Sequence, residues 1–422
     1  MTSNSLTEDQ IVVASRSVRL KLVLMMFLEF FIWGAWFPLV FGYLPHLKFS
    51  PGQQSWILNM FPLAALLAMF ISNQIADKFF SAEKTLAVSH LLGGLCMLGL
   101  SQTTAFWPFL ILMAIHCFFY VPTISIANAI AFNAMKDPSR EFGPVRMGGT
   151  IGWIAAAWPM FFLLGSNDKS LVSWTFIIAG IASLALAAFS LTLPHTPPRK
   201  DAKSSGLMAF IKASKSLAVP CIFVLWLVTF VDAAILQFYF SWTERFLTAI
   251  GIDQRWIMPI MSLGQIAEIL TMAILGYFLS RLGWRTTMIL GVLGHAVRFA
   301  VFAFFPEQPV VIIAVQILHG ICYAFFFATV YIFVDEYLPK DVRSSAQGLF
   351  NFMILGAGPF AANSIAPYLH DKLYGIADAD GSIKTNYPGL FMIPMFVSIA
   401  AAIVLAVAFW PSRRGPESLP RH

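Results

Sequence analysis

Two polar side chains stand in the middle of an apolar stretch that is long enough to cross a membrane. The run from Met258 to Arg281 carries Gln265 and Glu268 near its centre. A carboxylate at the centre of a membrane helix costs roughly 2.5–3.5 kcal/mol on insertion scales, so it is kept mainly where it faces a cavity, a partner charge or a proton. The two side chains are three residues apart and share one helix face. We therefore interpret Glu268 as a functional residue, with a hydrogen bond to a neighbouring helix as the alternative.

A second polar stripe lies beside a cluster of glycines. Arg146, Thr150 and Trp153 recur at i, i+4 and i+7, which places a charge, a hydroxyl and an indole on one helix face. Small residues such as Gly149 and Gly152 let a neighbouring helix or a ligand approach the backbone closely. The pattern fits a binding surface, and packing or loop anchoring is the alternative.

Glu29, Trp33 and Trp36 show the same spacing in the first apolar run. Beside a buried Glu, the Trp pair fits an aromatic wall for a flat ring, although such pairs also pack in cores or at the membrane interface. Gln237 is an isolated amide that can bind a ligand or join two helices. Further polar residues inside the apolar runs are Asp232, Arg298, His90, His116, His295 and His319, of which the histidines can relay protons or serve as hydrogen-bonded core residues.

The composition is that of a membrane protein. Of the 422 residues, 58% are hydrophobic and 11% are charged, and the mean hydropathy is +0.75, whereas soluble domains carry about 25% charged residues. The net charge of +6 would suggest nucleic acid for a soluble protein, but here its placement along the chain matters more, and we expect no nucleic-acid partner. The four cysteines fall inside apolar runs without metal spacing and are interpreted as core residues.

Apolar runs of about 20 residues predict an all-α membrane protein with twelve transmembrane helices. The expected spans are 18–44, 54–76, 84–104, 106–133, 144–165, 171–193, 217–247, 254–280, 285–305, 308–337, 342–370 and 388–410. The longest polar break, from Pro194 to Gly206, divides them into two groups of six. We therefore expect an N-terminal tail (1–17), a six-helix bundle (18–193), a central loop (194–216), a second six-helix bundle (217–410) and a C-terminal tail (411–422).

The placement of Lys and Arg predicts the orientation in the membrane. Most of the 27 Lys and Arg fall in the tails, the central loop and the alternate connections on the same side, which is the cytoplasmic side under the positive-inside rule. Both termini and the central loop are therefore expected in the cytoplasm. Acid–base pairs among Asp77, Lys78, Arg281 and Asp335 or Glu336 can latch that side, or these residues can serve as solvated caps.

The two halves of the chain resemble each other. IADKFFSAEK after the second span resembles FLSRLGWRT after the eighth, IHCFFY in the fourth resembles LHGICY in the tenth, and GPVRMGGT resembles KDVRSSAQ at the starts of the fifth and eleventh. Three such similarities in the same order indicate two parallel six-helix repeats. This is the architecture of the major facilitator superfamily, in which substrate binds near the midplane between halves that rock to expose it alternately to each side.

Motifs for catalysis or ATP binding do not occur in a credible context: we find no GxGxxG, Walker-type loop, HExxH or serine-nucleophile elbow. We expect no enzyme activity, no cofactor, no catalytic residue and no metal site. An ion gradient would have to drive uphill transport, and buried carboxylates suit protons.

Several segments resemble the bacterial nucleoside:proton symporter family of the major facilitator superfamily. They are LEFFIWGAW (28–36), RMGGTIGW (146–153), LTLPHTPP (191–198), GQIAEIL (264–270) and VRSSAQGLF (342–350). The resemblance implies a transporter that imports purine or pyrimidine nucleosides with protons and lies in the bacterial inner membrane, multi-pass and monomeric. It implies that the nucleoside site is lined by residues that match Arg146, Thr150, Gln237, Gln265 and Glu268, to which we add Trp153 and the aromatic wall of Trp33, Trp36 and Tyr323.

Two departures from the family pattern concern coupling and substrate range. Phe240 stands where the family carries an Asn, and Tyr323, Ala324 and Phe325 align with its helix 10 Asp. We expect Glu268 to carry the proton and Glu29 to replace the missing acid, with a structural ion pair as the alternative role of Glu29.

Other functions would use a similar set of residues. A sugar or oligosaccharide:proton symporter would need a similar polar and aromatic set, and a nucleoside facilitator would lack the coupling. An intramembrane enzyme that uses Glu268, or a receptor that binds without turnover, belongs to a different class, and flux into proteoliposomes distinguishes a transporter from both.

Overall fold

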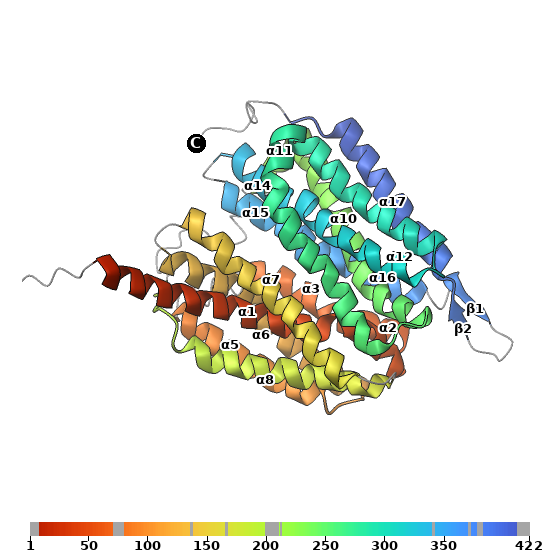
Figure 1. Cartoon of the computed structure of the whole chain (residues 1–422), viewed down its shortest axis with the longest axis horizontal. Helices are drawn as coiled ribbons and strands as arrows, with labels where there is room; N and C mark the ends of the chain where they lie inside the picture. Colours follow the sequence, from red (N-terminus) through yellow and green to blue (C-terminus); the bar gives the residue numbers. More distant parts are fainter. Residues whose placement is uncertain are drawn as a thin grey trace, which may run out of the picture.

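The computed structural model describes residues 8–70, 80–135, 138–164, 168–198, 211, 213–339, 342–369, 373–377 and 383–411. Nearly all of them are helical, which confirms the expected all-α class. The helices form two bundles, α1 to α8 in one and α10 to α17 in the other (Figure 1). Parts of the two tails, most of the central loop and the pair Asp77 and Lys78 lie outside the described residues.

The first bundle consists of α1 (Glu8–His46), α2 (Pro51–Leu58), α3 (Met60–Phe70), α5 (Ala82–Leu100), α6 (Phe106–Ala134), α7 (Pro138–Leu163), the 3-10 turn η1 (Lys169–Val172) and α8 (Ser173–Ser190). Helix α1 packs against α7 and α8, and α5 packs against α6 and α8. Helix α7, which carries Arg146, Thr150 and Trp153, therefore packs along α1.

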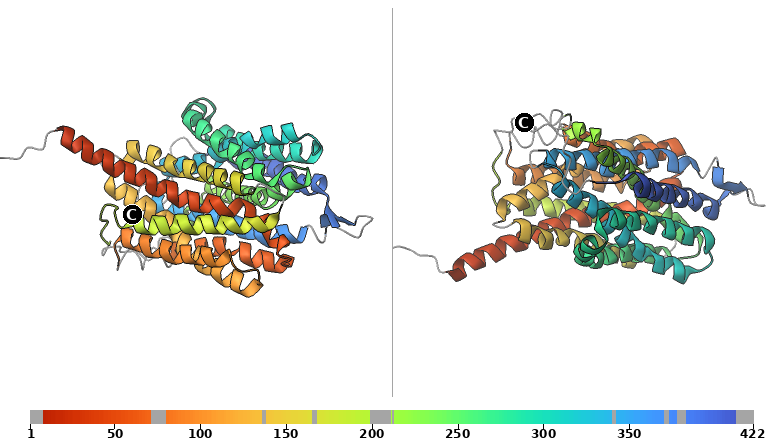
Figure 2. Two further views of the ribbon diagram at one scale, coloured as in Figure 1. Left: turned by 60° about the horizontal axis from the view of Figure 1, so that its bottom comes forward. Right: turned by 90° about the horizontal axis from the view of Figure 1, so that it is seen from above.

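The second bundle consists of η2 (Lys215–Ala218), α10 (Pro220–Ala249), α11 (Gln254–Phe304), α12 (Pro309–Ala314), η3 (Val315–Ile317), α13 (Leu318–Cys322), η4 (Tyr323–Ala328), α14 (Thr329–Tyr337), α15 (Arg343–Asn351), η5 (Phe352–Ala357), α16 (Gly358–Leu369), β1 (Gly375–Ala377), β2 (Ile383–Thr385) and α17 (Tyr387–Ala408). Helix α11 packs against α13 and α17, and α10 packs against α16 and α17. The antiparallel hairpin of β1 and β2 projects from the end opposite to the start of α1 (Figure 2).

Eight helical segments among the described residues are long and apolar enough to cross a membrane. One of them, the 51-residue α11, contains two of the expected spans, 254–280 and 285–305. Gly283 separates these two parts, because its φ of +71° lies in the left-handed region that favours glycine. The expected second span is interrupted after α2, where Asn59 caps that helix.

The structure corrects several expected boundaries and interruptions. Helix α1 begins at Glu8 rather than residue 18, and α7 begins at Pro138 rather than residue 144, because hydropathy marks only the apolar part of a helix that continues into polar surroundings. The expected continuous helices 308–337 and 342–370 contain the π-helical segments η4 and η5, and the hairpin of β1 and β2 was not expected. Close packing accompanies η4: a Cβ on Gly291 would lie 2.8 Å from the backbone nitrogen of Phe326.

Hydrogen bonds between the two bundles gather at the end where α1 ends and α2 begins, here called the closed end. Arg245 Nε donates to the carbonyl oxygen of Phe41 at 3.0 Å, and its Nη2 donates to Gln54 Oε1 at 3.1 Å. Lys169 Nζ lies 3.2 Å from Glu244 Oε1. Further bonds there join Asn59 to Ser364 and Asn363 to the carbonyl oxygen of Leu58. The closed end thus holds the bundles together by bonds that separation of the bundles would break.

Among the described residues, two polar pairs at the opposite end lie within single bundles. Arg343 Nη1 is 3.6 Å from Asp335 Oδ2, and Lys21 Nζ donates to the carbonyl oxygen of Thr192 at 2.7 Å. Asp335 of the expected latch thus pairs with Arg343 of its own bundle, while Asp77 and Lys78 lie outside the described residues.

Glu83 at the start of α5 anchors the segment that follows α8. Its carboxylate accepts hydrogen bonds from the backbone nitrogen of Thr196 at 3.0 Å and from His195 Nδ1 at 2.8 Å. Burial opposes its ionisation, but these hydrogen bonds outweigh burial and lower the pKa of Glu83 from 4.5 to about 2. A carboxylate whose pKa is lowered by folding stabilises the fold above pH 4.5, and this stabilisation is lost as the pH falls toward 2.

We predict that Glu83→Gln lowers the stability of the fold at pH 7 by roughly 1–3 kcal/mol, since one pKa unit corresponds to about 1.4 kcal/mol. Thermal unfolding of the purified protein measures the difference, which should shrink as the pH falls below 4.5. Glu307→Gln, which changes an exposed carboxylate, is the control. If the free energies of unfolding of Glu83→Gln and the parent differed by the same amount at pH 7 and at pH 3, the Glu83 charge would not have this role.

Candidate functional site

Aromatic rings join the two bundles near the middle of the molecule. Phe240 on α10 lies edge-on to Phe37 on α1, with ring centroids 5.3 Å apart, and Trp153 on α7 lies 6.3 Å from Phe240. Trp33 lies 5.2 Å from Trp153 and stacks on Phe61 at 4.8 Å. Trp33 of the expected aromatic wall and Trp153 of the second polar stripe are therefore neighbours at the contact between the bundles.

Glycines bring α1 and α7 together, as the glycine cluster predicts. A Cβ on Gly152 would overlap the carbonyl oxygen of Phe27, and a Cβ on Gly34 would lie 3.1 Å from the Trp153 ring. A Cβ on Gly149 would lie 2.7 Å from the Arg146 guanidinium. The close helix contact therefore fixes where the Arg146 and Trp153 side chains project.

Arg146 of the first bundle and Glu268 of the second lie on α7 and α11, two helices that pack against each other. The Arg146 guanidinium covers the ring of Phe30, with Cζ 3.9 Å from the centroid. Arg146, Glu268 and Tyr323 are each only partly buried. A cation and an anion therefore lie on two helices that meet between the bundles.

Gln265 and Glu268 are held by close packing of α11 on α13. A Cβ on Gly320 would overlap the backbone nitrogen of Glu268, so this glycine lets the two helices approach. Gln265 is 7% exposed, and its amide nitrogen lies 3.2 Å from His319 Nε2. Within the described part of the chain, the buried atoms Gln265 Oε1 and Trp33 Nε1 have no hydrogen-bond partner. A polar ligand between the bundles would give each of these two atoms a hydrogen-bond partner.

Gln237 and Thr150 differ in their surroundings. Gln237 is buried, and its Nε2 donates to Asn363 Oδ1 at 2.8 Å, while Asn363 donates to Leu58 of the first bundle at 3.0 Å. This amide therefore belongs to the bonds that join the bundles, which was the alternative role for it. Thr150 is half-buried on the same face of α7 as Arg146.

Trp36 and Tyr323 complete the set of expected wall residues. Trp36 is 3% exposed and packs inside the first bundle, 5.9 Å from the ring of His116 and 6.4 Å from Phe176. Trp36 and Trp33 both contact the ring of Phe37, each at 5.7 Å between centroids. Tyr323 is half-buried at the start of η4, on the same side of the second bundle as Glu268.

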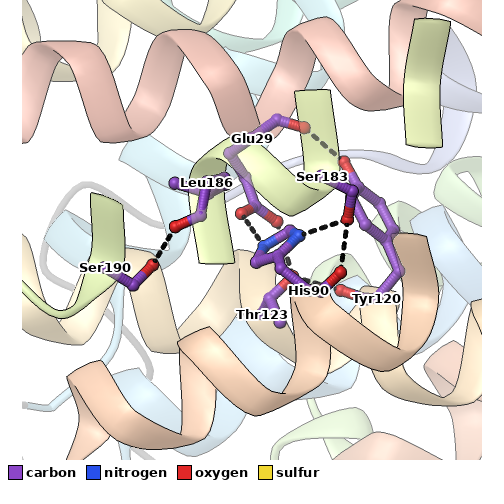
Figure 3. Close-up of polar contacts among 7 residues, drawn as sticks. All are labelled: Glu29, His90, Tyr120, Thr123, Ser183, Leu186 and Ser190. Carbon is purple, nitrogen blue, oxygen red and sulfur yellow. Dashed lines mark hydrogen bonds and ion pairs between the residues drawn. The ribbon is translucent and has the colours of Figure 1, made fainter. Parts of the chain in front are cut away.

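Glu29 is fully buried inside the first bundle (Figure 3). Its Oε2 lies 2.8 Å from His90 Nε2, and its Oε1 accepts a hydrogen bond from Thr123 at 2.6 Å. On the other side of the imidazole, His90 Nδ1 lies 3.1 Å from Ser183 Oγ. The sequence showed each residue but not the pairing, because Glu29 and His90 come from different helices. The partner of Glu29 is thus His90 of α5 rather than a cation near the end of the bundle.

Comparison with known proteins agrees with this arrangement. The family model of the nucleoside H+ symporter matches residues 16–414. The putative nucleoside transporter YegT of Escherichia coli (strain K12) is 33% identical over 400 residues, which cover 92% of this chain and 93% of YegT. The nucleoside permease NupG of the same organism is 29% identical over 365 residues, which cover 81% of this chain and 85% of NupG.

Solved structures show the same fold. The crystal structure of the nucleoside transporter NupG superposes with a TM-score of 0.81 at 25% identity, and the match covers 94% of this chain and 100% of that one. The D-xylose-proton symporter superposes with a TM-score of 0.72 at 13% identity over 96% of this chain and 98% of that one, which shows the fold alone. The expected major facilitator fold is thereby confirmed, and the family is one of transporters rather than enzymes. The match over nearly the whole length shows that the chain belongs to the nucleoside H+ symporter family.

Proposed function

We propose that this protein imports nucleosides together with protons by alternating access in the bacterial inner membrane. The observation that carries the proposal is the packing of α7, which carries Arg146, against α11, which carries Glu268, across the contact between the two bundles. Membership of the nucleoside H+ symporter family supplies the substrate class. A purine or pyrimidine nucleoside, protons and the lipid bilayer are the partners, and the transporter acts as a monomer.

The chemistry of the residues suits a nucleoside. The Glu268 carboxylate and the Gln265 amide can bind ribose hydroxyls, while Arg146 and Thr150 approach from the other bundle. Trp33, Trp153 and Tyr323 offer ring faces to a base, and such stacking contributes about 1–3 kcal/mol per base in nucleic-acid complexes. We assign Trp36 and Gln237 to supporting this wall and the contact between bundles, because both are buried beside protein partners.

The contacts between the bundles indicate the state of the transport cycle. With both termini in the cytoplasm, the closed end of Arg245, Gln54 and Asn363 faces the outside. The structure is then inward-facing, and the outward-facing state requires these hydrogen bonds to break. Because substrate contacts come from both bundles, binding favours the states in which the bundles lie close together.

Glu268 and Glu29 are the proposed proton-coupling groups. Glu268 lies in the site itself, so its protonation and nucleoside binding affect the same contacts. Glu29 shares a 2.8 Å contact with His90 in which a proton can be held. Ser183 Oγ donates to the backbone carbonyl of His90 at 2.9 Å, so His90 Nδ1 must donate to Ser183, and a second proton must lie between His90 Nε2 and Glu29.

We predict that labelled uridine or adenosine enters proteoliposomes against its concentration gradient when an inward proton gradient is imposed. The reason is that no ATP motif is present in the sequence, so only an ion gradient can drive accumulation. Transport of a disaccharide in place of both nucleosides would favour the sugar symporter, and uptake that is independent of pH would favour the nucleoside facilitator.

We predict that Glu268→Ala and Arg146→Ala each lower saturable nucleoside uptake by roughly tenfold or more, which is the effect of losing about 1.4 kcal/mol of binding. Uptake per molecule is measured at equal membrane expression, with Glu307→Gln as the control. Normal uptake by both variants would reject this site.

We predict that Glu29→Gln retains nucleoside binding and counterflow exchange but loses accumulation driven by a proton gradient. Gln keeps hydrogen-bonding capacity but cannot bind or release the proton shared with His90. Both activities are measured in the same proteoliposomes. Undiminished accumulation would leave Glu29 with the structural role of holding α1 to α5.

A further inference from the structure

The second bundle carries its own buried pair of a carboxylate and a histidine. Asp232 on α10 and His295 on α11 are both fully buried, and Asp232 Oδ2 lies 3.5 Å from His295 Nε2. Asp232 follows Glu29 by about 200 residues, as His295 follows His90, so the two pairs occupy corresponding positions of the repeat. His319 corresponds in the same way to His116, in the two similar segments of the fourth and tenth spans. The repeat therefore places an acid and two histidines in each bundle.

Arg298 distinguishes the second bundle from the first. It is fully buried on α11, and its Nη2 lies 2.8 Å from His295 Nδ1 while its Nη1 lies 3.2 Å from His319 Nδ1. A guanidinium has donors only, so both imidazoles must accept at Nδ1 and carry their hydrogen at Nε2. In the first bundle, His116 Nδ1 instead contacts the carbonyl oxygen of Gly93 at 3.1 Å.

The proton positions of the two bundles consequently differ. The contact of His90 with Glu29 holds a proton, as argued above. In the second bundle His295 is neutral, and its Nε2–H points toward Asp232, whose negative charge balances Arg298. Neither oxygen of Asp232 has a hydrogen-bond partner among the described residues, whereas both oxygens of Glu29 have one. Asp232 can therefore accept a proton without losing a hydrogen bond.

Few other charges surround Asp232. The groups that face the pair are His295 and Arg298 on α11, His319 and Cys322 on α13, and Tyr239 on α10, over whose ring Arg298 Cζ lies at 3.9 Å. The elements η5, α16 and α17 also pack against α10 and contain no Asp, Glu, His, Lys or Arg. Two further elements that pack against α10, α1 and η2, carry charged residues that include Glu29, which is bonded to His90, and Lys215. Protonation of Asp232 thus removes the one carboxylate that balances Arg298 in this described part of the bundle.

The chain of contacts continues from Arg298 to the proposed nucleoside site. His319 Nε2 lies 3.2 Å from the amide group of Gln265, three residues before Glu268 on α11. Since His319 carries its hydrogen at Nε2, the Gln265 amide oxygen is its natural acceptor, and a half-turn of the amide brings that oxygen to the imidazole. Asp232, His295, Arg298, His319 and Gln265 thus form one continuous chain of contacts from α10 to the proposed nucleoside site.

We propose that Asp232 binds and releases a coupled proton in the second bundle, and that His295, Arg298 and His319 link this proton to Gln265 in the nucleoside site. The step is reversible: the carboxylate takes up a proton to become a neutral acid, and no other bond forms or breaks. The proposal rests on the proposed nucleoside transport. It places a proton site in the seventh expected span, in addition to the proton-coupling groups proposed at Glu268 and Glu29.

The test is Asp232→Asn in proteoliposomes, with two measurements on the same preparation. Counterflow exchange of labelled nucleoside should stay within about threefold of the parent, whereas accumulation driven by an inward proton gradient should fall by roughly tenfold or more. Thr229→Val is the matched control: Thr229 is buried one turn before Asp232 and bonds only to the carbonyl oxygen of Leu225 in its own helix. It should retain both activities.

A second variant covers a failure of folding. Asp232→Asn leaves the Arg298 charge buried without a balancing anion, which can unfold a bundle. Asp232→Asn combined with Arg298→Gln removes both charges and should give the same loss of accumulation with exchange retained. Accumulation at the parent level by either folded variant would overturn the proposal while nucleoside transport stands. A parent protein that moves no nucleoside would overturn both.

Discussion

A charge inside a membrane protein is stable only when another group balances or hydrogen-bonds it, and this constraint organises the structure. Glu29 is bonded to His90 within the first bundle, and Asp232, His295 and Arg298 balance one another within the second. Arg146 and Glu268 are different, because they lie in opposite bundles, on helices that pack against each other. The first two groups can persist while the bundles rock, whereas rocking changes the distance between Arg146 and Glu268. A substrate with hydroxyls and a flat base can bind between these two charges.

The packing that positions these charges is provided by small residues and aromatic rings. Glycines let α1 approach α7 and let α13 approach α11, so the charged side chains are held on helices that have little room to shift. Phe240 then fills the contact between the bundles, against Phe37 on one side and the His319 ring, 5.7 Å away, on the other. Phe240 thus lies between the ring of Phe37 in the first bundle and the ring of His319 in the second.

The sequence predicted the parts of the fold that depend on local patterns. Apolar length and the repeated segments indicated two helical bundles, and the isolated polar residues Gln265 and Glu268 stood out because a membrane span rarely contains them. The partners of these residues were not predictable, because each comes from another helix: nothing in the sequence joins Glu29 to His90 or Arg298 to His319. The early start of α1, the π-helical η4 and the hairpin of β1 and β2 depend on tertiary contacts or polar surroundings, which hydropathy does not report. The repeat could have predicted the pair of Asp232 and His295, because these residues occupy the positions that correspond to Glu29 and His90. That inference requires knowing that Glu29 and His90 are in contact.

The central claim is that nucleoside movement and proton movement are one event in this protein. Proteoliposomes that contain a pH indicator, with equal pH on both sides and the membrane potential clamped at zero, test it most directly. Addition of uridine or adenosine outside should acidify the interior, with a fixed ratio of protons to nucleosides at every nucleoside concentration. Entry of nucleoside at an unchanged internal pH would contradict the account.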